Sequence, residues 1–264
     1  MMPMPGNVYL MQGPPGCGKT TWVVQKAADL VRRYGPESVL VASLTRTAAR
    51  EVRARELSLP GSQVGTLHSF AYRALGIRGV KVVDLEDPEL EFELPSERTV
   101  ARFLALRAAD VPRDRWPRKV RRFAAEWEAW KREEGAIEFE DMVERAAVET
   151  ECAPGRPRWV FIDESQDHSR LDLRLALRWG AAAKWLVLVG DPDQSIFGFR
   201  GADPSVFLDV PEERRQVLGQ SYRLPRAVHA FAARWIAKVR RRIRVDFRPR
   251  DAEGCVRRLD SDLS

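Results

Sequence analysis

The chain alternates between two patterns of apolar residues. Short continuous apolar runs, of the length that forms buried strands, occupy positions 8–11, 39–42, 159–162 and 185–190. A last short strand is expected at 216–218, which contains Val217 and Leu218. Segments with apolar residues at helical spacing lie between them, as at 20–34. Strand and helix patterns in alternation predict an α/β fold with a parallel sheet flanked by helices.

This alternation stops between positions 78 and 157, where the pattern is mostly helical. Large apolar residues recur there at spacings of four, three, four and three: Trp116, Val120, Phe123, Trp127 and Trp130. Such spacing places them on one face of a helix, and an aromatic stripe of this kind is typical of a core. We interpret 78–157 as a helical insertion (1B-like) within an ATPase domain whose two parts are 1–77 and 158–245. Residues 246–264 are expected to form a linker or the start of a further domain.

The P-loop pattern G-x-x-x-x-G-K-T follows the first apolar run and precedes the first helical one. Its glycines let successive backbone N–H groups turn inward toward a phosphate, beside a helix N-terminus. Its lysine is expected to reach the β- and γ-phosphates, and its threonine hydroxyl to ligate Mg²⁺. The expected nucleotide-binding residues here are Gln12, Gly13, Pro14, Pro15, Gly16, Cys17, Gly18, Lys19, Thr20 and Thr21.

Further polar residues follow the later buried strands. Asp163 and Glu164 end the run at 159–162, where open α/β sheets place ligands, so we expect Asp163 to join Thr20 on Mg²⁺ and Glu164 to act as general base. Gln194 follows the run at 185–190 and is suited to hydrogen-bond a γ-phosphate. Phe199 and Arg200, a few residues further along the chain, combine an aromatic ring with a cation, as single-strand binding surfaces do.

Composition narrows the class of protein. Hydrophobic content of 44% and charged content of 31% are ordinary for a globular protein. No apolar run approaches a membrane span of roughly 20 residues, so no membrane partner is expected. Three separated cysteines without a C-x-x-C pair indicate a reduced, cytoplasmic setting. The net charge of +6 is compatible with nucleic-acid binding.

An ordered series of segments resembles the UvrD/Rep/PcrA-type superfamily 1 DNA helicases. The series is GPPGCGKT, SLTRTAARE, VGTLHSFAYRAL, IEFEDMVERA, VFIDESQD, VGDPDQSIFGFRGA and LGQSYR. It runs from about Leu10 to Phe231, and its most specific part is the segment from Gly190 to Ala202. The resemblance implies a RecA-like ATPase domain that uses ATP and Mg²⁺ and acts on single-stranded DNA or single/double-strand junctions.

The resemblance also implies roles for individual residues. Gln194 would contact the γ-phosphate, Arg223 would act like an arginine finger, and Tyr222 would stack on adenine; Glu164, Gln194 and Arg223 form the expected catalytic set. The DNA-contacting positions that it implies are Thr45, Arg46, Thr66, His68, Phe199 and Arg200. Helicases of this family that translocate do so from 3′ to 5′.

The chain departs from the family pattern at several places. The adenine-reading glutamine of the family lies well upstream of the P-loop, but only 12 residues precede Gly13 here. Thr21 stands where an arginine is frequent, and Leu44 replaces a DNA-contacting phenylalanine. A second RecA-like domain is expected in a longer chain or in a partner protein, and without it we do not expect unwinding.

Two alternatives stay open at this point. The domain could be a non-enzymatic module whose affinity for DNA or a partner is gated by ATP, or a P-loop small-molecule kinase. ATP turnover with and without single-stranded DNA discriminates among the three functions.

Overall fold

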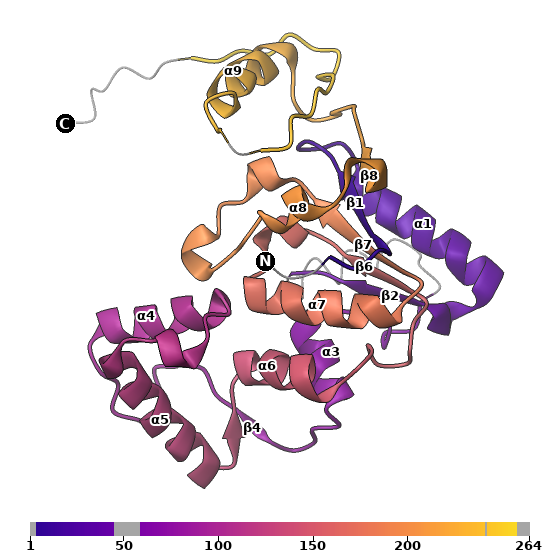
Figure 1. The fold of residues 1–264 in the computed structure, drawn as a ribbon. Helices are drawn as coiled ribbons and strands as arrows, with labels where there is room; N and C mark the ends of the chain where they lie inside the picture. Colours follow the sequence, from indigo (N-terminus) through magenta and orange to yellow (C-terminus); the bar gives the residue numbers. More distant parts are fainter. Residues whose placement is uncertain (1–3, 45–58, 241, 258–264) are drawn as a thin grey trace.

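The computed structural model of the chain describes residues 4–44, 59–240 and 242–257. A central parallel sheet lies between helices, a helical lobe extends from one side, and a smaller lobe around the last helix lies at the other end (Figure 1). The strands of the main sheet are β1 (Val8–Gln12), β2 (Val39–Ala42), β3 (Val64–Gly65), β6 (Trp159–Ile162), β7 (Trp185–Gly190) and β8 (Arg215–Val217).

Short strands β4 (Lys81–Val82) and β5 (Ala136–Ile137) form a separate parallel pair. The helices are α1 (Lys19–Tyr34), α3 (Leu67–Ala74), α4 (Glu97–Ala108), α5 (Arg118–Glu133), α6 (Phe139–Glu149), α7 (Arg170–Ala182), α8 (Val206–Asp209) and α9 (Arg226–Ile236). The predicted parallel α/β fold is confirmed.

The main sheet has the order β3-β2-β6-β7-β1-β8, and every neighbouring pair is parallel. The inner strands are buried on both faces, which explains their continuous apolar runs. Leu10 pairs with Leu188, and Ile162 pairs with Leu188 from the other side. The carboxyl ends of β6, β7 and β1 therefore meet at one edge of the sheet.

Successive side chains of the inner strands pack alternately into two apolar cores, one on each face of the sheet. Leu10 and Leu188 face the core shared with α3, α6 and α7. Met11, Val187 and Phe161 face the opposite core, which α1 covers. Helices α1 and α7 lie on opposite sides of the sheet (Figure 1).

The helical lobe has a third apolar core of its own, built from residues between 83 and 136. The predicted aromatic stripe lies in this core: Trp127 is fully buried, and Trp130 stacks on it with ring centroids 4.9 Å apart. Helix α6 belongs instead to the core of the sheet, through Met142 and Val143.

A buried ionic cluster joins this lobe to the sheet domain. Arg107 of α4, with its side chain 1% exposed, donates to Glu138 at 2.6 Å, Asp141 at 2.7 Å and Glu144 at 2.9 Å. Lys131 of α5 also pairs with Glu138 and Asp141. Burial would raise the pKa of Asp141, but the two cations hold this pKa below its usual 3.8.

The lobe around α9 is anchored to the rest of the molecule by polar contacts. Arg242 makes two hydrogen bonds to the Asp193 carboxylate, at 2.6 and 3.2 Å. Helix α9 is amphipathic, yet the structure describes all of its residues and none is buried. Phe231 and Trp235 on its apolar side are 42% and 57% exposed.

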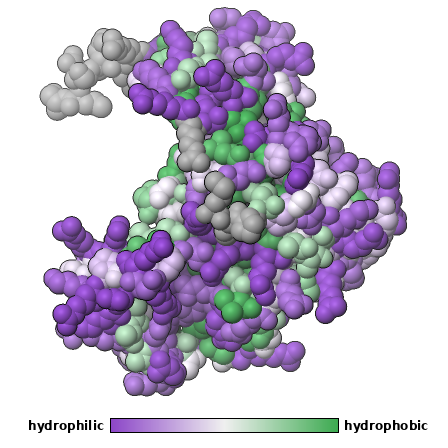
Figure 2. Space-filling view, viewed as in Figure 1, coloured by the Kyte–Doolittle hydropathy of each residue, from purple (hydrophilic) through white to green (hydrophobic). Residues whose placement is uncertain are grey.

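Two lobes project on either side of a recess (Figure 2). One lobe contains α9, and the other contains α4 and α5. The face in this view is mainly hydrophilic. Within the described part of the chain, no helix has both the length and the apolar character that crossing a membrane requires.

The Arg107→Met substitution is expected to lower the free energy of unfolding by about 3–5 kcal/mol, because it leaves buried carboxylates without their cation. Chemical denaturation followed by circular dichroism measures this difference. Arg122→Met removes a cation from an exposed i,i+4 pair with Glu126 and is the matched control, with an expected loss of about 0–1 kcal/mol.

The Arg107→Met effect should also depend on pH. A depressed folded-state pKa of Asp141 stabilises the fold above its unfolded pKa of 3.8, and this stability is lost as the pH falls through the folded value. The difference between wild type and variant should therefore be complete at pH 7 and shrink below pH about 4. A difference that is independent of pH would contradict this account of the cluster.

Candidate functional site

Loops that follow three neighbouring strands form the candidate site. The P-loop follows β1, Asp191 follows β7, and Asp163 follows β6. The backbone N–H of Gly13 donates to the Gly190 carbonyl at 3.3 Å, and that of Asp163 donates to the Ala42 carbonyl at 2.8 Å. These bonds continue the sheet into the loops and hold the loops side by side.

The P-loop makes a tight turn between β1 and α1, which begins at Lys19. Gly16 has φ of 69°, in the left-handed region that glycine adopts most readily. The described residues provide no side-chain cap at the N-terminus of α1, so its N–H groups are available for a phosphate. Lys19 is 8% exposed, and its Nζ donates to the Gly13 carbonyl at 3.0 Å.

Thr20 and Asp163 lie face to face across the site. The Thr20 hydroxyl donates to Asp163 Oδ2 at 3.0 Å. Burial raises the pKa of Asp163, and the neighbouring Glu164 carboxylate adds to this rise, while the hydrogen bond from Thr20 opposes it. A hydroxyl and a buried carboxylate with this paired geometry are hard oxygen donors that fit Mg²⁺.

Glu164 has an unusual backbone conformation. Its φ of 50° and ψ of 39° place a residue other than glycine in the left-handed region, which is often a feature of functional sites. Its backbone N–H donates to Asp163 Oδ1 at 3.0 Å, and its Oε2 accepts a hydrogen bond from Gln166 at 2.9 Å. The hydrogen bond from Gln166 thus holds the Glu164 carboxylate beside this turn.

Gln194 lies in the short 3₁₀ turn Pro192–Gln194 after β7. Its Nε2 donates to Asp191 Oδ2 at 2.6 Å, and the Asp191 side chain also accepts from the Asp193 backbone at 3.1 Å. Burial raises the pKa of Asp191, against the opposing effect of the hydrogen bond from Gln194. Asp191 therefore orients the predicted γ-phosphate contact.

The segment Ser221-Tyr222-Arg223 closes over the P-loop from a distant part of the chain. Ser221 Oγ donates to the Pro15 carbonyl at 2.7 Å, across 206 positions of sequence, and the Tyr222 N–H donates to the Gly16 carbonyl at 2.9 Å. A Cβ on Gly16 would lie 2.2 Å from Arg223 Cβ. The close approach brings the exposed Tyr222 and Arg223 side chains beside the phosphate loop.

Other predicted nucleotide-binding residues lie around the same loop. Gln12 at the end of β1 is 1% exposed, and its Oε1 has no hydrogen-bond partner among the described residues. Cys17 is buried, and burial raises the pKa of its thiol. Thr21 is exposed in the first turn of α1.

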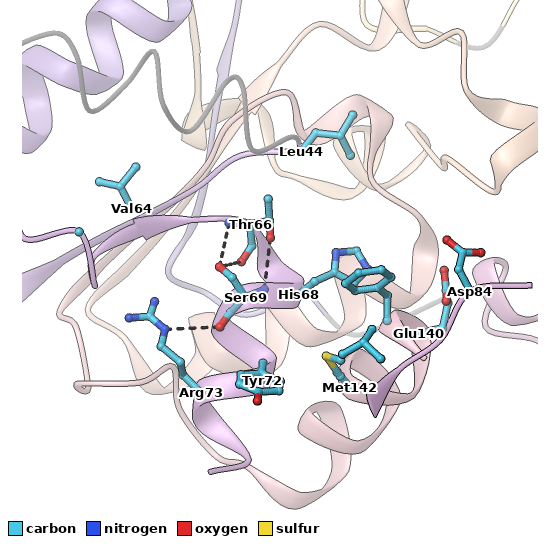
Figure 3. Close-up of a pocket in the computed structure, with 13 residues that line it drawn as sticks. Leu44, Val64, Thr66, His68, Ser69, Tyr72, Arg73, Asp84, Glu140 and Met142 are labelled. Carbon is cyan, nitrogen blue, oxygen red and sulfur yellow. Dashed lines mark hydrogen bonds between the residues drawn. The ribbon is translucent and has the colours of Figure 1, made fainter. Parts of the chain in front are cut away.

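A second group of predicted residues lies away from this loop, around a cavity of about 850 Å³ (Figure 3). Thr66 and Ser69 cap α3 reciprocally, at 3.2 and 3.1 Å, so the Thr66 hydroxyl already accepts a hydrogen bond. His68 packs its ring edge-on against Phe139 with centroids 5.7 Å apart. Leu44 lines the same cavity.

Phe199 lies in the turn Gly198–Arg200 and is 78% exposed. It lines a smaller cavity together with Ala108 of α4 and the acidic residues Asp84 and Glu140. Burial raises the pKa of Glu140, partly offset by Arg107. Thr45, Arg46 and the side chain of Arg200 lie outside the described part of the structure.

The sequence patterns missed three residues that organise the site. Ser221 and Asp191 make the bonds described above, and Gln166 joins Glu164 to the backbone of Asp191. One signal was available for Asp191, because it follows a buried strand as Asp163 does. Nothing in the sequence pattern indicates the contacts of Ser221.

The Gly16→Ala substitution is expected to raise the Kd for ATP about tenfold or more, because the added methyl group overlaps Arg223 and opens the loop. Titration with a fluorescent ATP analogue measures this. Gly76→Ala is the control: Gly76 also has positive φ, of 64°, but a Cβ there would meet nothing within 4 Å. Equal Kd values for the two variants would contradict the proposed contact.

Comparison with known proteins gives one family match and several relatives, among them ATP-dependent DNA helicases. The AAA domain family matches residues 2–200. The putative ATP-dependent DNA helicase YjcD of Bacillus subtilis is 26% identical over 251 residues, which are 79% of this chain and 33% of the relative. The ATP-dependent DNA helicase PcrA of Staphylococcus aureus is 26% identical over 269 residues, 84% of this chain and 37% of the relative.

The RecBCD enzyme subunit RecB of Mycolicibacterium smegmatis is 32% identical over 163 residues, 54% of this chain and 15% of the relative. The chain thus spans about a third of the length of the helicases YjcD and PcrA. The P-loop on a parallel sheet, the family match and these relatives agree with one another, and the chain belongs to the AAA domain family as a relative of the UvrD/Rep/PcrA-type DNA helicases.

Proposed function

We propose that this chain is the ATP-hydrolysing first motor domain of a UvrD-like 3′–5′ DNA helicase or translocase that acts on single-stranded DNA. The observation that carries the proposal is the contact of Ser221, Tyr222 and Arg223 with the same P-loop whose helix carries the Thr20–Asp163 pair. It supports a phosphate site that combines an arginine with a metal-binding pair.

Each residue has a chemical task in this proposal. Lys19 and the N-terminus of α1 bind the phosphates, and Thr20 and Asp163 would hold Mg²⁺, which would supply positive charge to neutralise the phosphates. Glu164 orients the attacking water and accepts its proton. Arg223 stabilises the negative charge that develops on the γ-phosphoryl group, as an arginine finger does. Tyr222, 72% exposed beside the loop, stacks on the base.

The proposed DNA side is connected to the nucleotide side by one continuous segment. Gln194 and Phe199 are five positions apart in the loop that follows β7. Phe199 offers an exposed ring for a base, and Thr66 and His68 lie on α3 beside the larger cavity. A shift of Gln194 on loss of the γ-phosphate would therefore move the base-stacking segment.

The proposed helicase or translocase also requires a second RecA-like domain. The apolar side of α9 is exposed at Phe231 and Trp235, where a further domain could cover it. The relatives YjcD and PcrA extend over about three times the length matched here. We assign unwinding to the assembly of both domains, whether the second domain belongs to the same polypeptide or to a partner.

The Glu164→Gln substitution is expected to lower steady-state ATP turnover by about 10²–10⁴-fold, because it removes the general base, while the Kd for ATP changes little. Single-stranded DNA at low salt should raise turnover of the wild type. Glu149→Gln, which changes an exposed carboxylate paired with Arg145, is the control.

Other outcomes of the same assay favour the alternatives. ATP binding without turnover under any condition would indicate an ATP-gated binding module. Transfer of the phosphoryl group to a metabolite rather than to water would indicate a kinase.

The Phe199→Ala substitution is expected to weaken single-stranded DNA binding by about 1–3 kcal/mol, the usual value of one base–aromatic stack. Fluorescence anisotropy with a labelled oligonucleotide measures it. Tyr34→Ala removes a 48% exposed ring at the far end of α1 and should leave the affinity unchanged. Unchanged affinity in the Phe199 variant would remove this residue from the proposed DNA surface.

A further inference from the structure

Gln166 occupies the space between Glu164 and the loop after β7. It is 3% exposed and lies in the 3₁₀ turn Ser165–Asp167. Its Nε2 donates to Glu164 Oε2 at 2.9 Å and to Asp167 Oδ2 at 3.0 Å. Its Oε1 accepts from the backbone N–H of Asp191 at 3.1 Å. One buried amide therefore contacts the predicted base and the start of the predicted sensor loop.

The chemistry of its neighbours fixes the orientation of this amide. The Asp191 backbone N–H can only donate, so it requires the oxygen of Gln166. The two carboxylates accept when ionised, so they require the nitrogen. A glutamate at position 166 would lack the donor and add a third negative charge, and a shorter asparagine would not span the same gap.

The surrounding backbone is arranged to admit the Gln166 side chain. A Cβ on Gly190 would lie 2.3 Å from Gln166 Oε1, so a residue with a side chain at position 190 would displace the amide. Two serine hydroxyls hold the same turn against β7: Ser165 Oγ donates to the Val189 carbonyl at 2.9 Å, and Ser195 Oγ donates to the Gln166 carbonyl at 3.0 Å.

The contacts continue from Gln166 to the predicted sensor. The backbone N–H of Asp191 binds Gln166, and the Asp191 carboxylate accepts from Gln194 Nε2 at 2.6 Å. Glu164, Gln166, Asp191 and Gln194 thus form one unbroken series of hydrogen bonds. Its members come from the loops after β6 and β7.

We propose that Gln166 is a positioning residue that holds the base Glu164 and the γ-phosphate sensor Gln194 in one fixed relation. The proposal rests on the ATPase function proposed above. Because Gln166 is buried and touches neither the phosphate loop nor Arg223 in the described contacts, its main effect is expected on the arrangement of these groups, with only a small effect on ATP affinity.

The first test is Gln166→Met, which retains most of the side-chain volume and removes both hydrogen-bonding functions. We expect kcat for ATP to fall on the order of 10–100-fold, with KM for ATP changed about twofold at most, because misplaced catalytic groups affect the transition state more than the ground state. Gln63→Met is the matched control: Gln63 is a 2% exposed glutamine that donates to Glu37 at 2.7 Å, away from the site.

A binding measurement tests the same proposal without turnover. The ratio of the Kd values for ADP and ATP reports how well the site distinguishes the γ-phosphate. It should fall by about twofold in Gln166→Met, the lower end of the range expected for the loss of one hydrogen bond, and stay at the wild-type value in Gln63→Met.

A double-mutant cycle tests the fit between Gly190 and Gln166. Gly190→Ala should lower kcat and the ADP/ATP ratio in the wild-type background. In a Gln166→Ala background, where Oε1 is absent, the same substitution should have a much smaller effect, because the two changes act on one contact. Circular dichroism confirms that each variant is folded.

The outcomes separate the two proposals. A Gln166→Met variant with wild-type kcat and a wild-type ADP/ATP ratio would overturn the positioning role, as would additive effects of Gly190→Ala and Gln166→Ala. Absence of turnover in the wild type would contradict the hydrolase function, and the ADP/ATP ratio and the cycle on that ratio would then decide the role of Gln166.

Discussion

The parallel register of β6, β7 and β1 is the constraint on which the rest of the site depends. Because these strands are adjacent and run in the same direction, the residues that follow them meet at one edge. The P-loop, Asp191 and Asp163 owe their proximity to this arrangement rather than to attraction among themselves. The two apolar cores on either face of the sheet hold the register in place.

Backbone hydrogen bonds carry much of the precision at this edge. Gly13 binds Gly190, Tyr222 binds Gly16, and the Ser221 hydroxyl binds the Pro15 carbonyl. Backbone groups have few degrees of freedom, so such bonds position loops closely. Two carboxylates are buried at this edge, and burial is the main cause of the raised pKa values of Asp163 and Asp191.

The helical lobe is connected to this domain by charge rather than by apolar packing alone. Arg107 of α4 is shared among three carboxylates of the segment that contains α6, and α6 packs in turn against α3, which carries Thr66 and His68. A buried cation with several partners is sensitive to geometry. The cluster therefore holds the lobe in a defined position relative to the proposed DNA-facing helix.

Elements whose signal is local follow directly from the order of residues along the chain. Apolar runs predicted β2 and β7 at their observed bounds, the helical spacing of the tryptophan stripe predicted a core, and the P-loop pattern predicted a strand, a turn and a helix in order. These signals depend on residues that are close in the chain, so periodicity and glycine placement reveal them.

The contacts between residues far apart in the chain are visible only in the folded molecule. Ser221 reaches Pro15 across 206 positions, and Gln166 reaches the backbone of Asp191 across 25. Arg107 finds its carboxylates across 31 to 37 positions. A serine, a glutamine or an arginine carries no mark of its partner in the local pattern, because hydrogen bonds and ion pairs have no periodicity. The order of the strands in the sheet creates these contacts.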